Sequence, residues 1–367
     1  MHRLGLCGAF VLAALFVSPA HGQVKLAWKW KKGGKFFVRT ETKVQQTVVV
    51  EDPRGDVRAP PAALGGVLGA VGLAGTGKAI ARNTAYDREI RQTFRHVAYL
   101  QYEVLEENKD GTFAVRQQIV KELKLLKGPG NKDEEEHPVH DPLLGPAQGK
   151  AGAELILHLT PTGEVTRVEG QDKLLEKLAS ADTEKRQALQ EALSETSLKR
   201  ALSEALGFLP AERVKVSDGW KRTAELNLGP LGRVEVEHRY AYEGKGEGED
   251  KELDRIDRTT QLIRFAPEPR WPSPVPLGAA AGGTITASAP PRSLSFRVTQ
   301  GTFRLAEGKG SLFFDADKGR LARASTEARL EGTLTIRNSA TTYRTRLVQQ
   351  QSTLTEVKET LDKLPKE

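Results

Sequence analysis

Strict alternation of apolar and polar side chains is the feature that most limits what this chain can fold into. A period of two residues belongs to a β-strand, because successive side chains point to opposite faces of the sheet. This period dominates the segment 86–104, which predicts one long amphipathic strand. Its even positions carry Ile90, Phe94, Ala98, Leu100, Tyr102 and Val104, and its odd positions carry Asp87, Glu89, Arg91, Thr93 and Arg95.

The same period returns along the chain between short turns. Residues Asn108 to Gly111 predict a turn that leads into a second strand, and residues Pro161 to Gly163 predict the tip of a hairpin. Residues 232–244 alternate again, and a last set of strands runs from about residue 310 to 357. Long neighbouring strands with short turns predict an antiparallel sheet that is apolar inside and charged outside.

A helical period is confined to residues 171–209. Leucines recur there at spacings of three, four or five, and Pro210 closes the run. The pattern predicts two or three helices laid against the sheet. The expected fold class is therefore α+β, mainly β: a long-stranded curved antiparallel sheet or half-barrel with a helical insert packed on it.

Three segments break these patterns and set the expected organisation of the chain. Residues 51–84, 128–150 and 266–292 are rich in Gly, Pro, Ala or acidic residues and have no period that fixes a core face, so we interpret them as excursions or linkers. The expected sheet domain is 23–265, and 293–367 supplies strands that complete the same sheet. Whether 266–292 divides two domains stays open at this level.

The first 22 residues have the pattern of a secretory signal peptide. Arg3 precedes an apolar run of about 14 residues, and Ala20 and Gly22 stand at the small-residue positions of a cleavage site. The pattern predicts an exported protein, periplasmic or extracellular, that starts at Gln23. Cys7 is the single cysteine of the sequence, so the mature chain would have no disulfide and no thiolate metal site.

The formal net charge of +7 does not indicate a nucleic-acid partner, because basic and acidic residues are interspersed nearly everywhere. The exception is 25–37, where five lysines surround two tryptophans and two phenylalanines. Such a segment could contact anionic polymers, lipid head groups or nucleic acid. The alternation of Leu26, Trp28 and Trp30 with polar residues instead favours a half-buried strand.

The stretch GLAGTGKA, residues 72–79, has the glycine and lysine spacing of a phosphate-binding loop. Ala79 occupies the position where such a loop needs Ser or Thr, and no hydrophobic strand precedes Gly72. We therefore expect no nucleotide to bind, and interpret the stretch as part of a flexible hairpin tip.

The histidines give one candidate metal site and no catalytic centre. His137, His140 and Asp141, beside an acidic run, carry ligands that suit zinc, although a proline-containing loop fixes no geometry. His96, His158 and His238 fall within strands, where hydrogen-bonded core histidines are common. No nucleophile elbow, zinc-protease helix or complete calcium loop is present, and FDADKG reads as a turn. The sequence thus predicts a protein that is not an enzyme and has no cofactor.

Several stretches carry a family resemblance that reaches from about residue 25 to 350. They are LAWKWKKGGKFFVRTETKVQQTV, YLQYEVLEENKDGTFAVRQQIVKELK, LTPTGEVTRVEG, LPAERVKVSDGW, YAYEGKG and SLFFDADKGRLARA. In these stretches the chain resembles an uncharacterised family of exported proteins, a domain of unknown function of planctomycete-type bacteria. The resemblance implies neither an activity nor catalytic residues.

Three functions follow as hypotheses. The first is a non-enzymatic envelope protein that binds a lipid or an apolar partner, such as an envelope protein segment, in a concavity between sheet and helices. The second is a structural or assembly module with a solid core that binds partners through its flexible loops. The third is a hydrolase with a dispersed site, which would need a pocket that gathers one of the strand histidines with carboxylates.

Overall fold

The computed structural model describes residues 23–51, 89–127, 137–138, 154–179, 190, 193–227, 233–266, 296–338 and 341–360. The expected signal peptide and the residues 52–88 and 267–295 lie outside these ranges. The stretch at 72–79 falls in the first of these two gaps. Most of the excursion at 128–150 is outside as well, including His140 and Asp141.

The described residues form twelve strands, all joined in one sheet. Every strand pair is antiparallel, so the predicted fold class is confirmed. The strands are β1 (Lys35–Glu51), β2 (Glu89–Glu107), β3 (Phe113–Lys127), β4 (His137–Pro138), β5 (Glu154–Leu159), β6 (Val165–Glu169), β7 (Gly219–Asn227), β8 (Arg233–Lys245), β9 (Asp254–Ala266), β10 (Phe296–Asp315), β11 (Arg320–Asn338) and β12 (Thr341–Lys358).

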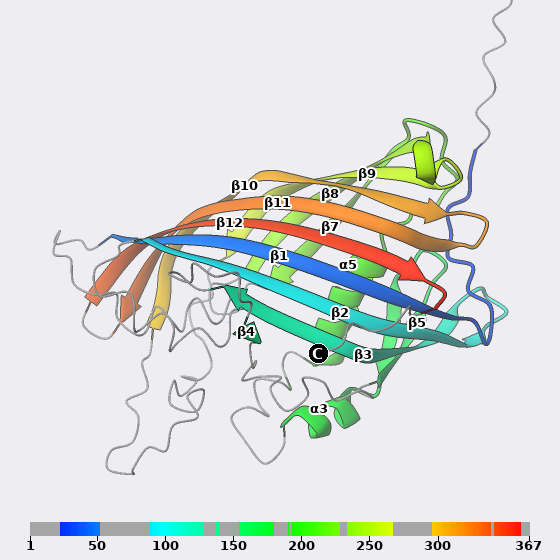
Figure 1. The fold of residues 1–367 in the computed structure, drawn as a ribbon, viewed down its shortest axis with the longest axis horizontal. Helices are drawn as coiled ribbons and strands as arrows, with labels where there is room; N and C mark the ends of the chain where they lie inside the picture. The colour runs from blue at the N-terminus through cyan, green and yellow to red at the C-terminus, as the bar shows by residue number, and fades with distance from the viewer. Residues whose placement is uncertain are drawn as a thin grey trace, which may run out of the picture.

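The sheet brings the two ends of the described chain together. Its order is β6-β5-β3-β2-β1-β12-β11-β10-β9-β8-β7, and β4 pairs with β3 beside this path. The first strand, β1, pairs along its length with the last, β12, from Phe37 opposite Lys358 to Glu51 opposite Arg344. The strands that follow residue 293 therefore lie in the same sheet as those before residue 266 (Figure 1).

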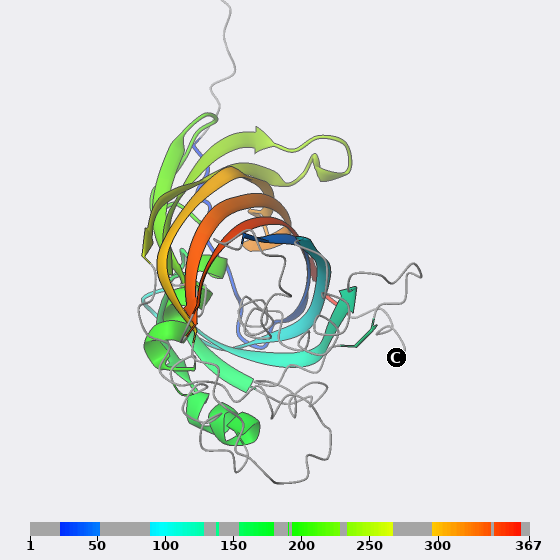
Figure 2. The same ribbon diagram turned by 90° about the vertical axis from the view of Figure 1, so that its left-hand side faces the viewer.

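The sheet curls strongly about its long axis, as the end-on view shows (Figure 2). Register shifts between Leu305 and Glu307 in β10, and between Tyr99 and Leu100 in β2, accompany this curvature, as β-bulges do. Its edges are β6 and β7. Two helices are described in the expected helical range, α3 (Gln171–Ala179) and α5 (Glu195–Leu206). Neither is long and apolar enough to cross a membrane.

Helix α5 lies against the edge strands rather than across the face of the sheet. The Ser203 hydroxyl accepts a hydrogen bond of 2.9 Å from the backbone N–H of Val165 in β6. On its other side Arg200 forms an ion pair of 2.7 Å with Glu225 of β7. The helix thus gives a partner to a backbone group of one edge strand and contacts the other, where unpaired strand groups would otherwise remain.

Residues 23–34 cross one end of the sheet, which we call the capped end. The backbone N–H of Trp28 donates to Pro161 O in the β5–β6 turn, and that of Lys29 donates to Gly319 O in the β10–β11 turn. The alternation in this segment correctly marks buried residues, since Leu26, Trp28 and Trp30 are buried. The predicted strand is wrong, because only Val24 forms a bridge, with Val214, and β1 begins at Lys35.

The tryptophans of this segment form the centre of the core at the capped end. The Trp28 ring lies 5.6 Å from Phe314 and 5.9 Å from Phe208, both edge-on, and 5.0 Å from Trp30. Each such aromatic pair contributes about 0.5–1.5 kcal/mol beyond its buried area. Trp28 therefore joins the end of β10, the segment after α5 and the N-terminal segment in one cluster.

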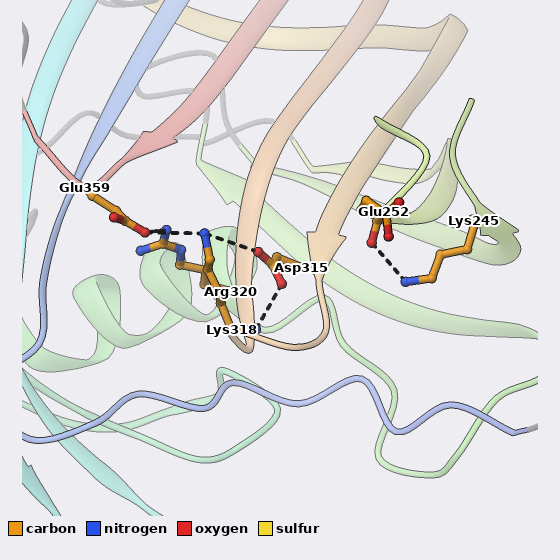
Figure 3. A network of polar contacts seen from close by, with 6 residues as sticks. All are labelled: Lys245, Glu252, Asp315, Lys318, Arg320 and Glu359. Carbon is orange, nitrogen blue, oxygen red and sulfur yellow. Dashed lines mark hydrogen bonds and ion pairs between the residues drawn. The ribbon is translucent and has the colours of Figure 1, made fainter. Parts of the chain in front are cut away.

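A second set of polar contacts holds the turns at the capped end (Figure 3). Lys318 and Arg320 of the β10–β11 turn both contact Glu359, just after β12, at 3.3 and 2.6 Å. The fully buried Asp254 accepts from the Tyr242 hydroxyl at 2.7 Å and contacts Lys245 Nζ at 3.2 Å. Burial first, then the hydrogen bond with Asp254 and its charge, raise the pKa of Tyr242.

The concave face is not apolar throughout, which corrects the expectation of an apolar inside. Between Val38 and the buried Val48, β1 turns Thr40, Thr42 and Gln46 to this face. These residues meet polar neighbours, since Thr42 Oγ1 lies 3.2 Å from Thr353 Oγ1. A strand of 17 residues is about 58 Å long, too long for one compact core to cover. The apolar clusters therefore lie toward the strand ends.

Replacing Gly319 tests how much the fold depends on the N-terminal segment. A Cβ at Gly319 would lie 2.4 Å from the backbone N of Lys29, so Gly319→Ala should displace the segment that carries Trp28. We expect a loss of about 2–5 kcal/mol in the free energy of unfolding, from overpacking and the left-handed backbone together. Denaturation in urea measures it.

Gly248→Ala is the matched control. Gly248 has the same φ of +61° but no atom within 4 Å of an added Cβ. The control should therefore lose only about 1–2 kcal/mol, the cost of the left-handed conformation. Equal losses in the two variants would show that contact with residues 23–34 does not stabilise the fold.

Candidate functional site: a cavity between α5 and strands β7 and β8

The ends of α5 are fixed by local hydrogen bonds. Ser194 is the N-cap, and its hydroxyl accepts from the backbone N–H of Ser197 at 3.3 Å. At the other end the N–H of Gly207 donates to Ser203 O at 2.8 Å. The chain then turns into the buried residues Phe208 and Leu209.

Side chains from other elements satisfy the carbonyl groups at the end of α5. Trp28 Nε1 donates to Leu206 O at 3.1 Å, and Trp220 Nε1 of β7 donates to Phe208 O at 2.8 Å. Arg222, also in β7, donates through Nη2 to Leu209 O at 2.9 Å. The carbonyl groups at a helix C-terminus carry partial negative charge, so a guanidinium group beside them is favourable.

A cavity of about 490 Å³ lies between α5 and the strands β7, β8 and β9. This volume is in the range of small-molecule sites, about 300–1,000 Å³. Its walls are mainly charged or polar, and are formed by Arg200, Ser203, Glu204, Gly207, Arg222, Thr223, Ala224, Glu225, Glu235, His238, Tyr240 and Arg264.

Two of the three arginines that line the cavity are neutralised by carboxylates. Arg200 pairs with Glu225 at 2.7 Å, and Arg264 pairs with Glu235 at 3.4 Å. These side chains are partly or largely exposed, and such pairs contribute at most about 1 kcal/mol. They form a neutral outer part of the cavity wall.

His238 is the buried polar group of the inner wall, with 5% of its surface exposed. Its Nδ1 lies 2.9 Å from the hydroxyl of Thr260 in β9. Its Nε2 lies 3.5 Å from Glu204 Oε1, yet makes no hydrogen bond with any described residue. Buried polar groups normally have a partner, so Nε2 is a buried donor or acceptor that no described residue satisfies.

Tyr240 lies next to His238 on the same face of β8. Burial raises the pKa of its hydroxyl, and this effect exceeds the opposing charges of Arg258 and Arg222 and the hydrogen bond with Arg258. The ring stacks on Trp220 at 5.5 Å with an interplanar angle of 13°. The hydroxyl therefore stays protonated at neutral pH and is surrounded by two guanidinium groups.

The three strand histidines lie apart, and each contacts a different glutamate. His96 pairs with Glu122 at 2.7 Å and His158 with Glu169 at 2.9 Å, both partly exposed. Only His238 contributes to the cavity. Of the predicted metal ligands, His137 lies in β4, where it pairs with Leu126, and the others are outside the described residues. No cluster of three or more metal-binding side chains occurs among the described residues.

Arg222, Glu204 and Tyr240 were not singled out from the sequence. The sequence does mark Arg222 as unusual, because this charged residue stands between Trp220 and Ala224 on the face of β7 that alternation predicts to be apolar. Arg258 likewise follows Ile256 on the buried face of β9. A charged residue at an apolar position of the period is the pattern that would have located this wall. Nothing in the helical period singles out Glu204.

Comparisons with known proteins assign no activity. Residues 128–246 match a family described as "Family of unknown function (DUF6263)", a segment that holds α5, β7 and β8. This agrees with the expectation of an uncharacterised domain. No curated protein matches.

Two solved structures show weak similarity. One is entitled "Lipid-protein interactions in lipovitellin" and is 9% identical to this chain at a TM-score of 0.38. The match includes 92% of this chain but only 27% of that chain. The second, DynF from the dynemicin biosynthesis pathway of Micromonospora chersina, is 6% identical at a TM-score of 0.17, with coverages of 91% and 85%. At these TM-scores neither similarity carries an argument.

Replacing Ser203 tests how α5 is held over the cavity. Ser203→Ala leaves the backbone N–H of Val165 without its partner, so we expect a loss of about 1–2 kcal/mol in the free energy of unfolding. Hydrogen exchange of the α5 amides should also become faster. Thr196→Ala, at an exposed position of the same helix, should change stability by less than about 0.5 kcal/mol. Unchanged exchange in Ser203→Ala would contradict this anchoring.

Proposed function

We propose that this chain is an exported, non-enzymatic binding protein of the cell envelope that holds a small amphipathic molecule between α5 and the β7–β8 strands. The observation that carries the proposal is the cavity of about 490 Å³ at the sheet–helix junction, with the unpartnered His238 Nε2 in its wall. Export rests on the signal-peptide pattern of residues 1–22.

The lining of the cavity favours an amphipathic ligand over a purely apolar one. An apolar molecule against Arg222, Glu204 and His238 would remove water from these groups without replacing its hydrogen bonds, at a cost of about 1–3 kcal/mol for each group. A ligand with a polar head group replaces those bonds.

The face of the sheet that continues from the cavity is apolar. Beyond His238 on the same face of β8 come Val236 and Val234, both buried, and β9 continues this face with Leu262 and Phe265. The Phe265 ring packs edge-on against Phe303 of β10, with ring centroids 4.6 Å apart. A polar wall followed by an apolar face is the arrangement that a lipid-like molecule needs.

Native mass spectrometry of the protein, extracted gently from its own cells, tests this function. We expect a copurified small amphiphile bound to the chain. Ala224→Phe, which places a ring in the cavity, should abolish this added mass, whereas Thr259→Phe, at an exposed position of β9, should retain it. A chain without added mass that also fails to bind dodecanoate and dodecanol would refute the proposal.

A hydrolase is the second candidate, because Glu204 and His238 line the same cavity 3.5 Å apart. Ser203 also lines it, but its hydroxyl is already bonded to Val165 N–H. As a binding protein, the chain should not hydrolyse p-nitrophenyl acetate or butyrate above the rate in buffer. Hydrolysis that disappears in His238→Gln, while Thr259→Phe keeps it, would instead establish the enzyme.

A further inference from the structure

Arg222 is the arginine of the cavity wall that has no carboxylate partner among the described residues. Its one hydrogen bond, from Nη2, goes to a neutral carbonyl, Leu209 O. A guanidinium group has five N–H donors, so most of its donors are left for another acceptor. The cavity therefore contains a positive charge that no described side chain neutralises.

A second guanidinium group, that of Arg258, lies on the same face of the sheet as His238 and Tyr240. Arg258 of β9 stands opposite Tyr240 in the sheet, and both arginines influence the pKa of the Tyr240 hydroxyl. The Nε of Arg258 is buried and makes no hydrogen bond with any described residue. Arg258 also has no ion pair within the described ranges. Two positive charges, of which only Arg222 lines the cavity, therefore stand against one negative charge of the lining, that of Glu204.

His238 adds a directed donor to this positive wall. When the Thr260 hydroxyl donates to Nδ1, the neutral imidazole carries its proton on Nε2. That N–H is buried 3.5 Å from Glu204 Oε1 and makes no hydrogen bond with any described residue. An acceptor atom of a ligand in the cavity would complete its bonding.

We propose that the polar end of the ligand is an anion with a single negative charge, with Arg222 as its counter-charge and His238 Nε2 as its second hydrogen-bond donor. This inference rests on the proposed binding function and specifies its ligand. The two guanidinium groups and Glu204 together leave one positive charge, which a single negative charge neutralises. A doubly charged group would leave an excess of negative charge. The carboxylate of a long-chain acid and the phosphodiester of a lipid share this chemistry.

Isothermal titration of the full mature chain with matched probes tests the charge. Dodecanoate and dodecanol have the same chain and differ in the head group. The protein should bind dodecanoate about 10- to 100-fold more tightly than dodecanol, as expected for hydrogen bonds to a charged group. Equal binding of the two would overturn the anion inference and leave the binding function standing. Binding of neither would refute both.

Variants of two arginines, one in the cavity and one outside it, locate the counter-charge. Arg222→Met should weaken dodecanoate binding about 10- to 100-fold and change dodecanol binding less than about twofold. Arg239→Met removes an exposed arginine of β8 that is paired with Glu237 and does not line the cavity, and should change both affinities less than about twofold. Equal effects of the two substitutions on dodecanoate would overturn the assignment to Arg222.

Glu204→Gln keeps the test decisive if Arg222→Met fails to fold, since Arg222 also binds Leu209 O. Removal of the negative charge that faces the site should strengthen dodecanoate binding severalfold and leave dodecanol unchanged. Weaker dodecanoate binding would overturn the inference. A lysophosphatidylglycerol with a dodecanoyl chain carries the phosphodiester head group, and dodecanoate carries the carboxylate. The one of the two that binds more tightly identifies the head group that the site recognises.

Discussion

Burial of the N-terminal tryptophans at one end of the sheet is the interaction on which the rest of this structure depends. Trp28 contacts Phe314 at the end of β10 and Phe208 after α5, and its indole N–H binds the last carbonyl of the helix. These groups come from three distant parts of the chain. Most of each long strand in this open sheet lies far from a compact core. The aromatic core at the capped end is therefore the main packing that fixes the curvature of the sheet.

The same core also sets the position of the cavity. The segment after α5 is held by Trp28, by Trp220 and by Arg222, so that the helix ends at a defined point beside β7. Along the helix itself no residue is buried. A helix whose end is fixed but whose side chains are only lightly packed can lie over a space that a fully packed helix would fill. This packing explains why a polar cavity lies next to a dense aromatic core.

Alternation in the sequence was sufficient to predict the antiparallel sheet, its turns at Asn108 and Pro161, and the buried face of β8. It failed where an extended chain is buried without pairing, as at residues 23–34, because alternation reports which side of the chain is buried and not whether a neighbour strand is present. It also failed along the middle of β1, where Thr40 and Thr42 share the concave face with valines. The position of α5 could not be predicted, since it depends on contacts between Ser203, Arg200 and strands far away in the sequence.

The charged residues on the concave face are the part of the structure that stability alone explains least. A guanidinium group taken from water and left without a carboxylate costs stability, whereas apolar residues of similar size at Arg222 and Arg258 would continue the core. Arg222 recovers part of that cost from Leu209 O, but Arg258 Nε and His238 Nε2 have no partner within the described ranges. These three donors come from the neighbouring strands β7, β9 and β8, and an acceptor on a bound molecule, as in the proposed function, would give them partners. Under the proposed function this acceptor would be the polar end of an amphipathic molecule, because apolar residues of β8 and β9 continue the face beyond these donors.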